Sequence, residues 1–477
     1  MNTSQDQSAR AAAALRGQVY FCALISGIAG LTYEILWNRD LLLIFGSTTY
    51  AASAVLATFM GGMAIGAGLV SRWGVRVKNP LIFYAIVEAV VAAYAIFLNS
   101  ILGVLSEGVA SIGSGGTATE LMITPLLVGG AALLLPTVAM GVALPLLGLY
   151  LDRLPVKKFH YAGMLYGFNT LGATIGAFAA GFVLIPRLGM TATLFAAILA
   201  SLGAAGVSLN LAFRAKPRIL SQPIKVTGDE EVQRVSLVIW IVVILSSAAA
   251  LGYEVVWARI LVLIFGSSTY SFTIVVAVFV FGIALGSFWS GSRIGRLRAH
   301  PEVLAHLQIG IAFVTLVSLF LYGHLPETFF HLMGLTSELS VILLGQIVIV
   351  SVILLPTTFL IGASFPLAIR ILDGRELVNR GKNFGAVFGL TSAGNVIGVL
   401  ISSLILIPLF GLQGTIWSLA LISTAAALTL FLSDRNIRFR FQTVGLTVGG
   451  LLFIWIWSPN WDPLVMTSGV YAKAPAY

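Results

Sequence analysis

The segment YEILWNR at residues 33–39, followed by LIFGSTTY at residues 43–50, decides the architecture because it occurs twice. It returns 220 residues later as YEVVWAR at residues 253–259 and LIFGSSTY at residues 263–270. Glycines and prolines continue the match, as in the pairs Gly62 and Gly282, Gly172 and Gly394, and Pro186 and Pro408. Solenoid repeats are about 20–50 residues long. The longer period found in this chain indicates two duplicated halves.

The composition indicates a protein that lies in a membrane. Hydrophobic residues make up 58% of the chain and charged residues only 9%, with a mean hydropathy of +0.99, whereas soluble proteins carry about 25% charged residues. A span needs about 20 apolar residues in a helix, which satisfies its own backbone groups in lipid. We therefore predict an all-α polytopic membrane protein with thirteen apolar spans, at residues 18–45, 49–71, 80–105, 122–151, 161–186, 190–212, 235–265, 269–291, 303–323, 339–369, 384–410, 414–433 and 441–457.

The basic residues predict the orientation of these spans. Nearly all of the 27 lysines and arginines lie in the N-terminal segment or in every second connection; the exceptions are Arg39, Arg187, Arg259 and Lys473. Cytoplasmic connections are enriched in Lys and Arg. We therefore expect a cytoplasmic N-terminus in the inner (plasma) membrane. The net charge of +9 then reflects topology, and no nucleic acid is expected as a partner.

The spans divide into two parallel repeats and one addition. Six spans per repeat is an even number, so both repeats begin on the same side of the bilayer, as in major facilitator transporters. The predicted organisation is an N-terminal cytoplasmic segment (1–17), a first six-helix repeat (18–213), a polar cytoplasmic linker (214–234), a second six-helix repeat (235–433), an additional C-terminal hydrophobic segment (434–460) and a tail (461–477).

Charged and amide side chains inside the spans form the candidate polar site. They are Glu34, Arg39 and Glu88 in the first repeat, and Glu254, Arg259 and Gln308 at the equivalent positions of the second. A charge in lipid costs at least a few kcal/mol unless it is paired or hydrated, so these groups should face the bundle interior. The five-residue spacing of Glu34 and Arg39 does not favour a pair on one helix, so we expect partners on other helices. Both a cation- or proton-responsive pathway and a buried structural ion pair fit this pattern.

Two asparagines complete the candidate site. Asn169 precedes Gly172 and Gly176, and Asn395 lies between Gly394 and Gly398. Small residues four apart let helix backbones approach closely in lipid. We therefore expect these segments to be helix-packing surfaces that carry one polar side chain each.

The repeated motifs resemble a known family over almost the whole chain. Tyr-Glu-x-x-Trp-x-Arg followed by Phe-Gly-Ser-[Ser/Thr]-Thr-Tyr, then the run from Asn169 to Gly172 and the pair Ile185 and Pro186, resembles the membrane region of bacterial spermidine synthase-like proteins. Many of those proteins carry a fused aminopropyltransferase-like domain, and residues 461–471 resemble the passage into it. The resemblance implies an association with polyamine chemistry, and a fused or separate aminopropyltransferase-like domain as a partner.

The chain carries no catalytic signature of its own. Aminopropyl transfer needs a nucleotide-binding fold with a Gly-rich loop and aspartates for the amine, and no such segment follows residue 477. No zinc signature, nucleophile elbow or phosphate loop occurs in the sequence. Cys22 is the only cysteine, which excludes an intrachain disulfide and a cysteine metal cluster. We predict no catalytic residue, no cofactor and no metal, in either a fragment of a longer protein or a membrane module whose soluble partner is separate.

Two classes of function remain open. In the first, the chain is a carrier that moves a small solute between the repeats, with a cationic amine attracted to Glu34, Glu88 and Glu254. In the second, it is a membrane anchor or a regulatory or structural subunit for an aminopropyltransferase-like domain or a larger membrane complex. A solute path reached by the carboxylates favours the carrier, and a tightly packed interior with all charges paired favours the anchor.

Overall fold

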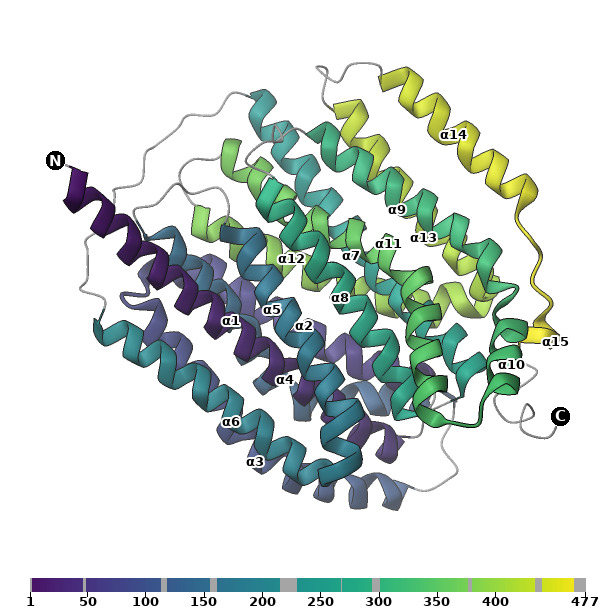
Figure 1. Ribbon diagram of the computed structural model, residues 1–477, viewed down its shortest axis with the longest axis horizontal. Helices are drawn as coiled ribbons and strands as arrows, with labels where there is room; N and C mark the ends of the chain where they lie inside the picture. The colour runs from purple at the N-terminus through teal and green to yellow at the C-terminus, as the bar shows by residue number, and fades with distance from the viewer. Residues whose placement is uncertain are drawn as a thin grey trace.

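A computed structural model gives the architecture of the chain (Figure 1). It describes residues 2–45, 49–112, 118–154, 161–214, 230–266, 268–293, 301–375, 380–433 and 440–466. Helices dominate these ranges, and no strand occurs in them. The predicted all-α membrane fold, with two parallel six-helix repeats and an additional C-terminal helix, is confirmed.

The helices follow the predicted order. The first half contains α1 (Asn2–Phe45), α2 (Thr49–Trp73), α3 (Pro80–Ile112), α4 (Ala118–Asp152), α5 (Tyr161–Phe178) and α6 (Ile185–Arg214). The second half contains α7 (Glu230–Phe265), α8 (Thr269–Arg293), α9 (Pro301–Tyr322), α11 (Leu339–Arg375), α12 (Arg380–Ile401) and α13 (Ile407–Ser433). The short elements are η1 (Gly74–Arg76), η2 (Ala179–Leu184), α10 (Leu325–Leu335), η3 (Ser402–Leu406) and α15 (Pro463–Met466), and α14 (Arg440–Trp457) is the additional helix.

Two of the apolar stretches are long enough to cross a membrane twice. Tyr161–Arg214 and Asn383–Ser433 contain 54 and 51 residues, and at 1.5 Å per residue each exceeds twice the roughly 30 Å of hydrocarbon. Each is interrupted at one glycine with positive φ, Gly189 at 81° and Gly411 at 66°, a conformation that glycine adopts without steric cost. Both glycines lie between spans that the sequence predicts to be separate.

The chain reverses direction at these glycines. On the two sides of Gly189, Asn169 donates to the carbonyl of Ala23 (3.1 Å) and Ala204 accepts from the Cys22 thiol (3.9 Å). One turn of α1 therefore contacts both arms of the α5–α6 hairpin. In the second half, a Cβ on Gly252 would meet both Ser402 and Leu419, so α7 has the same relation to the α12–α13 hairpin. Each hairpin includes a π-helical segment, η2 or η3, just before its turn.

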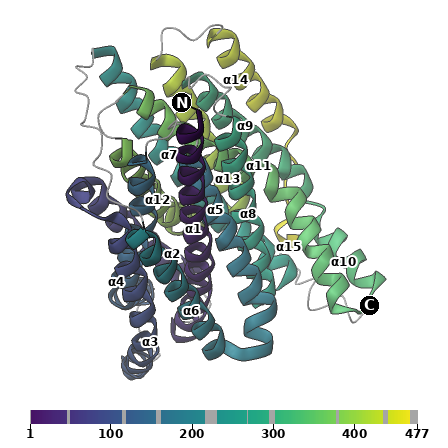
Figure 2. The same cartoon turned by 60° about the vertical axis from the view of Figure 1, so that its left-hand side comes forward.

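The two halves meet along two helix pairs, α5 with α8 and α2 with α12. In Figure 1 these four helices lie in the middle of the molecule, and Figure 2 shows the same arrangement turned by 60°. Glycines allow the close approach. A Cβ on Gly163 of α5 would lie 2.6 Å from the Cα of Gly291 of α8, and one on Gly389 of α12 would lie 3.3 Å from the backbone nitrogen of Gly68 of α2. The interface thus contains the same pairing twice: the fifth helix of each half packs against the second helix of the other.

The additional helix α14 runs along the outside of the second half, where Figure 1 draws it in yellow. It packs against α9 and α13. The segment after it is anchored near the start of α13, since Gln413 donates to Pro459 O (2.7 Å) and Trp461 Nε1 donates to Leu319 O at the end of α9 (3.2 Å). The end of α14 therefore lies beside the first residues of α13.

Parts of the predicted organisation lie outside the described residues. These are residue 1 of the N-terminal segment, residues 215–229 of the linker, residues 434–439 of the additional segment and residues 467–477 of the tail. Residues 2–17 form the start of α1. Helix α10, between α9 and α11, is not anticipated from the sequence because its 11 residues are too few for a span.

The predicted glycine packing surfaces join the first helix of each half to its fifth. A Cβ on Gly172 would lie 1.9 Å from Leu24 O, and one on Gly398 would lie 2.0 Å from Ala248 O. Backbones in such contact exclude any side chain. These contacts fix the rotation of α1 and α7, and with it the direction in which their polar residues point.

We expect Gly172→Ala to destabilise the protein by about 1–3 kcal/mol, because the added methyl group overpacks the α1–α5 contact. Gly203→Ala is the matched control, since a Cβ on Gly203 of α6 meets no atom within 4 Å. Thermal unfolding of the purified variants in detergent measures the difference. Equal stability of the two variants would contradict the packing described here.

Candidate functional site

The third helix of each half carries a buried polar residue that bonds to the first. In the first half, the Ser26 hydroxyl donates to Glu88 Oε1 (2.5 Å). In the second, Gln308 Nε2 donates to the Ser246 hydroxyl (2.9 Å). The partners are 62 residues apart in both halves, so the equivalence of Glu88 and Gln308 that the sequence predicts holds in space.

These two positions are closed off from solvent to the same degree but differ in what surrounds them. Glu88 is 4% exposed and Gln308 is 0% exposed. Beside Glu88, Tyr84 donates to Cys22 O (3.1 Å), which fills the space next to the carboxyl. Beside Gln308 the side-chain oxygen has no hydrogen-bond partner. The surroundings of Glu88 are therefore filled, whereas the side-chain oxygen of Gln308 remains an unused hydrogen-bond acceptor.

Glu34 and Glu254 are less buried than the aromatic residues beside them. Their neighbours Tyr33 and Trp37 stack with ring centroids 5.0 Å apart, as do Tyr253 and Trp257 at 5.4 Å, and all four rings are buried. Both glutamates are half-buried, in contrast to these rings.

The partners expected on other helices are not found in the described part of the chain. There, Glu34, Arg39, Glu254 and Arg259 take part in no ion pair or hydrogen bond, and the side-chain ion pair that is present joins His331 to Glu327 in the exposed helix α10 (3.8 Å). Arg39 is half-buried and Arg259 is exposed. The four charged residues are therefore arranged differently from a buried structural ion pair.

The two candidate asparagines link the fifth helix of each half to the first. Asn169 donates to Ala23 O (3.1 Å), from α5 to α1. With its amide oriented so that both ends find partners, Asn395 donates to Ser247 O (3.1 Å) on α7 and to Thr391 O (3.3 Å) on its own helix. Both side chains thus satisfy backbone carbonyls at a helix crossing, and only Asn395 also borders a cavity.

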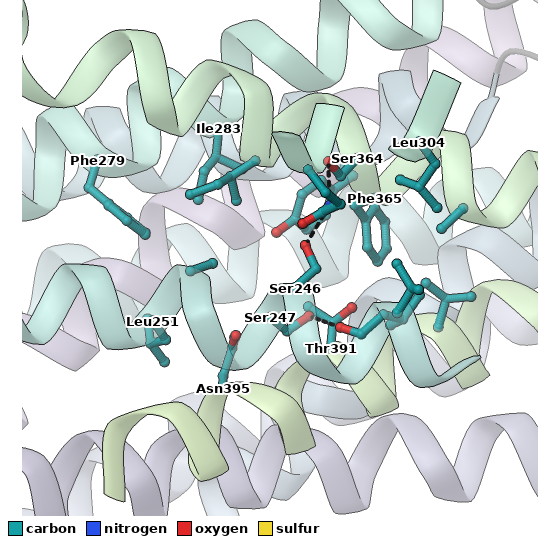
Figure 3. Close-up of a pocket in the computed structure, with 18 residues that line it drawn as sticks. Ser246, Ser247, Leu251, Phe279, Ile283, Leu304, Ser364, Phe365, Thr391 and Asn395 are labelled. Carbon is teal, nitrogen blue, oxygen red and sulfur yellow. Dashed lines mark hydrogen bonds between the residues drawn. The ribbon is translucent and has the colours of Figure 1, made fainter. Parts of the chain in front are cut away.

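A cavity of about 80 Å³ brings Gln308 and Asn395 together. It is lined mainly by α7, α8, α9, α11 and α12, with Tyr166 contributed by α5 of the first half. Figure 3 shows the polar groups that converge on it: Ser246, Ser247, Ser364, Thr391 and Asn395. Glu34, Arg39, Glu88, Glu254, Arg259 and Asn169 do not line it. The sequence analysis missed the hydroxyl groups, although Ser246 repeats Ser26 at the 220-residue period.

An aromatic cluster closes one end of this cavity. Tyr166 and Phe365, which both line the cavity, have ring centroids 4.2 Å apart. Phe384 and Phe388 of α12 pack on Phe365 at 5.9 and 6.3 Å. The cluster consists of these four residues and joins α5 to α11 and α12. It lies toward the ends of these helices that carry the basic connections.

Comparison with known proteins supports the fold. The Escherichia coli fucose:proton symporter FucP is similar to this chain with a TM-score of 0.51 and 14% identity, over 88% of this chain and 99% of the symporter. A bacterial homologue of the iron transporter ferroportin, in an inward-facing state, is similar with a TM-score of 0.50 and 16% identity, over 94% of this chain and 99% of that one. The arrangement of helices is thus like that of major facilitator transporters.

No protein-family model matches the chain, and no curated protein sequence does either. The similarity to two transporter structures at such low identity describes the fold alone. None of these comparisons supports the resemblance to spermidine synthase-like proteins, which stays a prediction.

We expect Glu88→Gln to fold as stably as the wild type, because an amide oxygen still accepts from Ser26 and the second half already uses glutamine at this position. Glu88→Leu removes that acceptor and leaves a buried hydroxyl without a partner, at a cost of about 1–3 kcal/mol. Thermal unfolding in detergent compares the two. A Glu88→Gln variant as unstable as Glu88→Leu would show that the charge itself is required.

Proposed function

We propose that this chain is a membrane carrier for a small cationic amine, which moves through a path between the two halves. The single observation that carries the proposal is the pair of half-buried, unpaired carboxylates of Glu34 and Glu254. An ionisable residue held inside a membrane without a structural partner marks a substrate or ion pathway by default. Two such groups, equivalent in the duplicated halves, are suited to attract a positive charge.

The arrangement of the halves is suited to alternating access. Rocking of one repeat against the other around a fixed central site is the common transport mode of folds with duplicated repeats. The interface formed by α5 with α8 and α2 with α12 includes close glycine contacts, such as Gly163 with Gly291 and Gly389 with Gly68. The aromatic cluster of Tyr166, Phe365, Phe384 and Phe388 would close the path on one side, and its separation would open it.

Polyamines are the first solutes to test, because the repeated motifs resemble the membrane region of spermidine synthase-like proteins. We expect purified protein in proteoliposomes to take up radiolabelled spermidine or putrescine. Glu34→Gln and Glu254→Gln should each lower uptake by about tenfold or more, because losing one charge–charge contact in a poorly solvated site costs at least about 1.4 kcal/mol.

The matched control is Glu327→Gln, which removes a carboxylate whose side chain is 72% exposed in α10, and it should transport like the wild type. Uptake of neither amine, with a proton gradient imposed in either direction, would overturn polyamines as the solute, and failure of the amino alcohol tested below as well would overturn the carrier proposal. That result would leave a membrane anchor or regulatory subunit for an aminopropyltransferase-like domain as the better reading.

We further propose, from the distribution of Lys and Arg, that the N-terminus and the basic connections lie in the cytoplasm. A fluorescent protein inserted after Lys225 of the linker should then fluoresce in cells. Alkaline phosphatase inserted after Thr336, between α10 and α11, should be active because this connection would face outward. No fluorescence after Lys225 and no phosphatase activity after Thr336 would show that the N-terminus lies on the outer side of the membrane.

A further inference from the structure

The cavity lies next to Glu254 on one face of α7. Six residues of that helix line it, namely Val242, Val243, Ser246, Ser247, Ala250 and Leu251. Glu254 follows Ala250 by four residues and Leu251 by three, the spacings that place side chains on the same helix face. The carboxylate of Glu254 therefore lies about one turn, or ~6 Å along the axis, beyond the lined part of α7. The cavity and the proposed amine site are neighbours on a continuous strip of α7.

The cavity holds polar groups but no charge. None of its 18 lining residues is Asp, Glu, Lys, Arg or His. A cation placed there would lose its hydration without meeting a counter-charge, which is costly in a low-dielectric interior. An uncharged group is therefore the fitting occupant, in contrast to the amine at the carboxylates.

The hydrogen-bonding capacity that remains in the cavity matches a hydroxyl group. The side-chain oxygen of Gln308 is buried and accepts from no donor, so it needs a donor from the occupant. The hydroxyls of Ser364 and Ser247 already donate to Leu360 O and Val243 O. Those of Ser246 and Thr391 donate to no acceptor in the described part of the chain. A ligand hydroxyl would donate to Gln308 and accept from Ser246 or Thr391.

The same position in the first half is built differently. Glu88 accepts from Ser26 in a packed environment, whereas Gln308 lines a cavity and keeps an unused acceptor. The two halves thus present different groups at equivalent positions, as expected for a site that recognises one end of an asymmetric solute.

We infer that the solute carries two different ends: a cationic amine bound by Glu254 and Glu34, and an uncharged hydroxyl group bound in the cavity by Gln308 and Ser246. Amino alcohols are therefore the preferred class over diamines of the same length. The inference rests on the proposed function, because it assigns the second end of the solute that the carboxylates attract.

Three amines of equal carbon-chain length separate the end groups in proteoliposome uptake measured by mass spectrometry. They are 4-aminobutan-1-ol, with one amine and one hydroxyl, putrescine, with two amines, and butylamine, with one amine and no second polar group. The wild type should take up the amino alcohol at least about tenfold more efficiently than either of the others, because only its hydroxyl satisfies Gln308 without burying a second charge.

Gln308→Glu should reverse this preference, because a carboxylate in the cavity would pair with the second ammonium group of putrescine. The matched control is Gln346→Glu on α11. Gln346 is 5% exposed and its side-chain oxygen also has no partner, but it does not line the cavity. That variant should keep the wild-type preference. Ser246→Ala, a smaller change, should lower uptake of the amino alcohol severalfold and leave putrescine unchanged.

The outcomes distinguish this inference from the carrier proposal. Equal uptake of all three amines, with Gln308→Glu and Ser246→Ala like the wild type, would mean that the cavity holds water only; it would overturn the inference and leave the carrier intact. Uptake of none of them, nor of spermidine, would overturn both. A wild-type preference for putrescine would also overturn the inference, since it requires a second charge to be accepted.

Discussion

Direct contact between the backbones of the first and fifth helices of each half is the constraint on which the rest of this structure depends. Lipid offers no hydrophobic force to bring helices together, so association relies on close packing of small residues. At Gly172 and Gly398 that packing is so close that a methyl group would overlap a carbonyl oxygen of the facing helix. It sets the rotation of α1 and α7. The Tyr–Trp stacks then fill the core of each half, and the glutamates beside them stay only half-buried.

Duplication makes the differences between the halves informative. The two halves use the same serine, at the same spacing, to hold the polar residue of the third helix. Where the first half has a carboxyl group that is enclosed and bonded, the second has an amide with an acceptor to spare and empty space next to it. Glu88 and Gln308 therefore give the two halves different hydrogen-bonding groups at equivalent positions.

Much of the fold was predictable because apolar length and repetition are local properties of the chain. The spans, the parallel halves and the divisions near Gly189 and Gly411 all follow from the order of apolar and small residues. The glycine packing surfaces follow from spacing on one helix. The missing ion-pair partners of Glu34 and Arg39 could not be predicted, because pairing depends on which side chains of other helices turn toward them. The cavity could not be predicted either, since Ser364 and Thr391 are ordinary small polar residues that only the packing of several helices brings together.

The turns at Gly189 and Gly411 have a mechanical consequence. Each joins two crossing helices through a single residue of unusual backbone conformation, with no loop to absorb strain. The α5–α6 and α12–α13 hairpins are therefore stiff units. Each also contributes one helix, α5 or α12, to the interface between the halves. A movement of one half against the other would therefore carry each hairpin as a unit past its partner helix, α8 or α2.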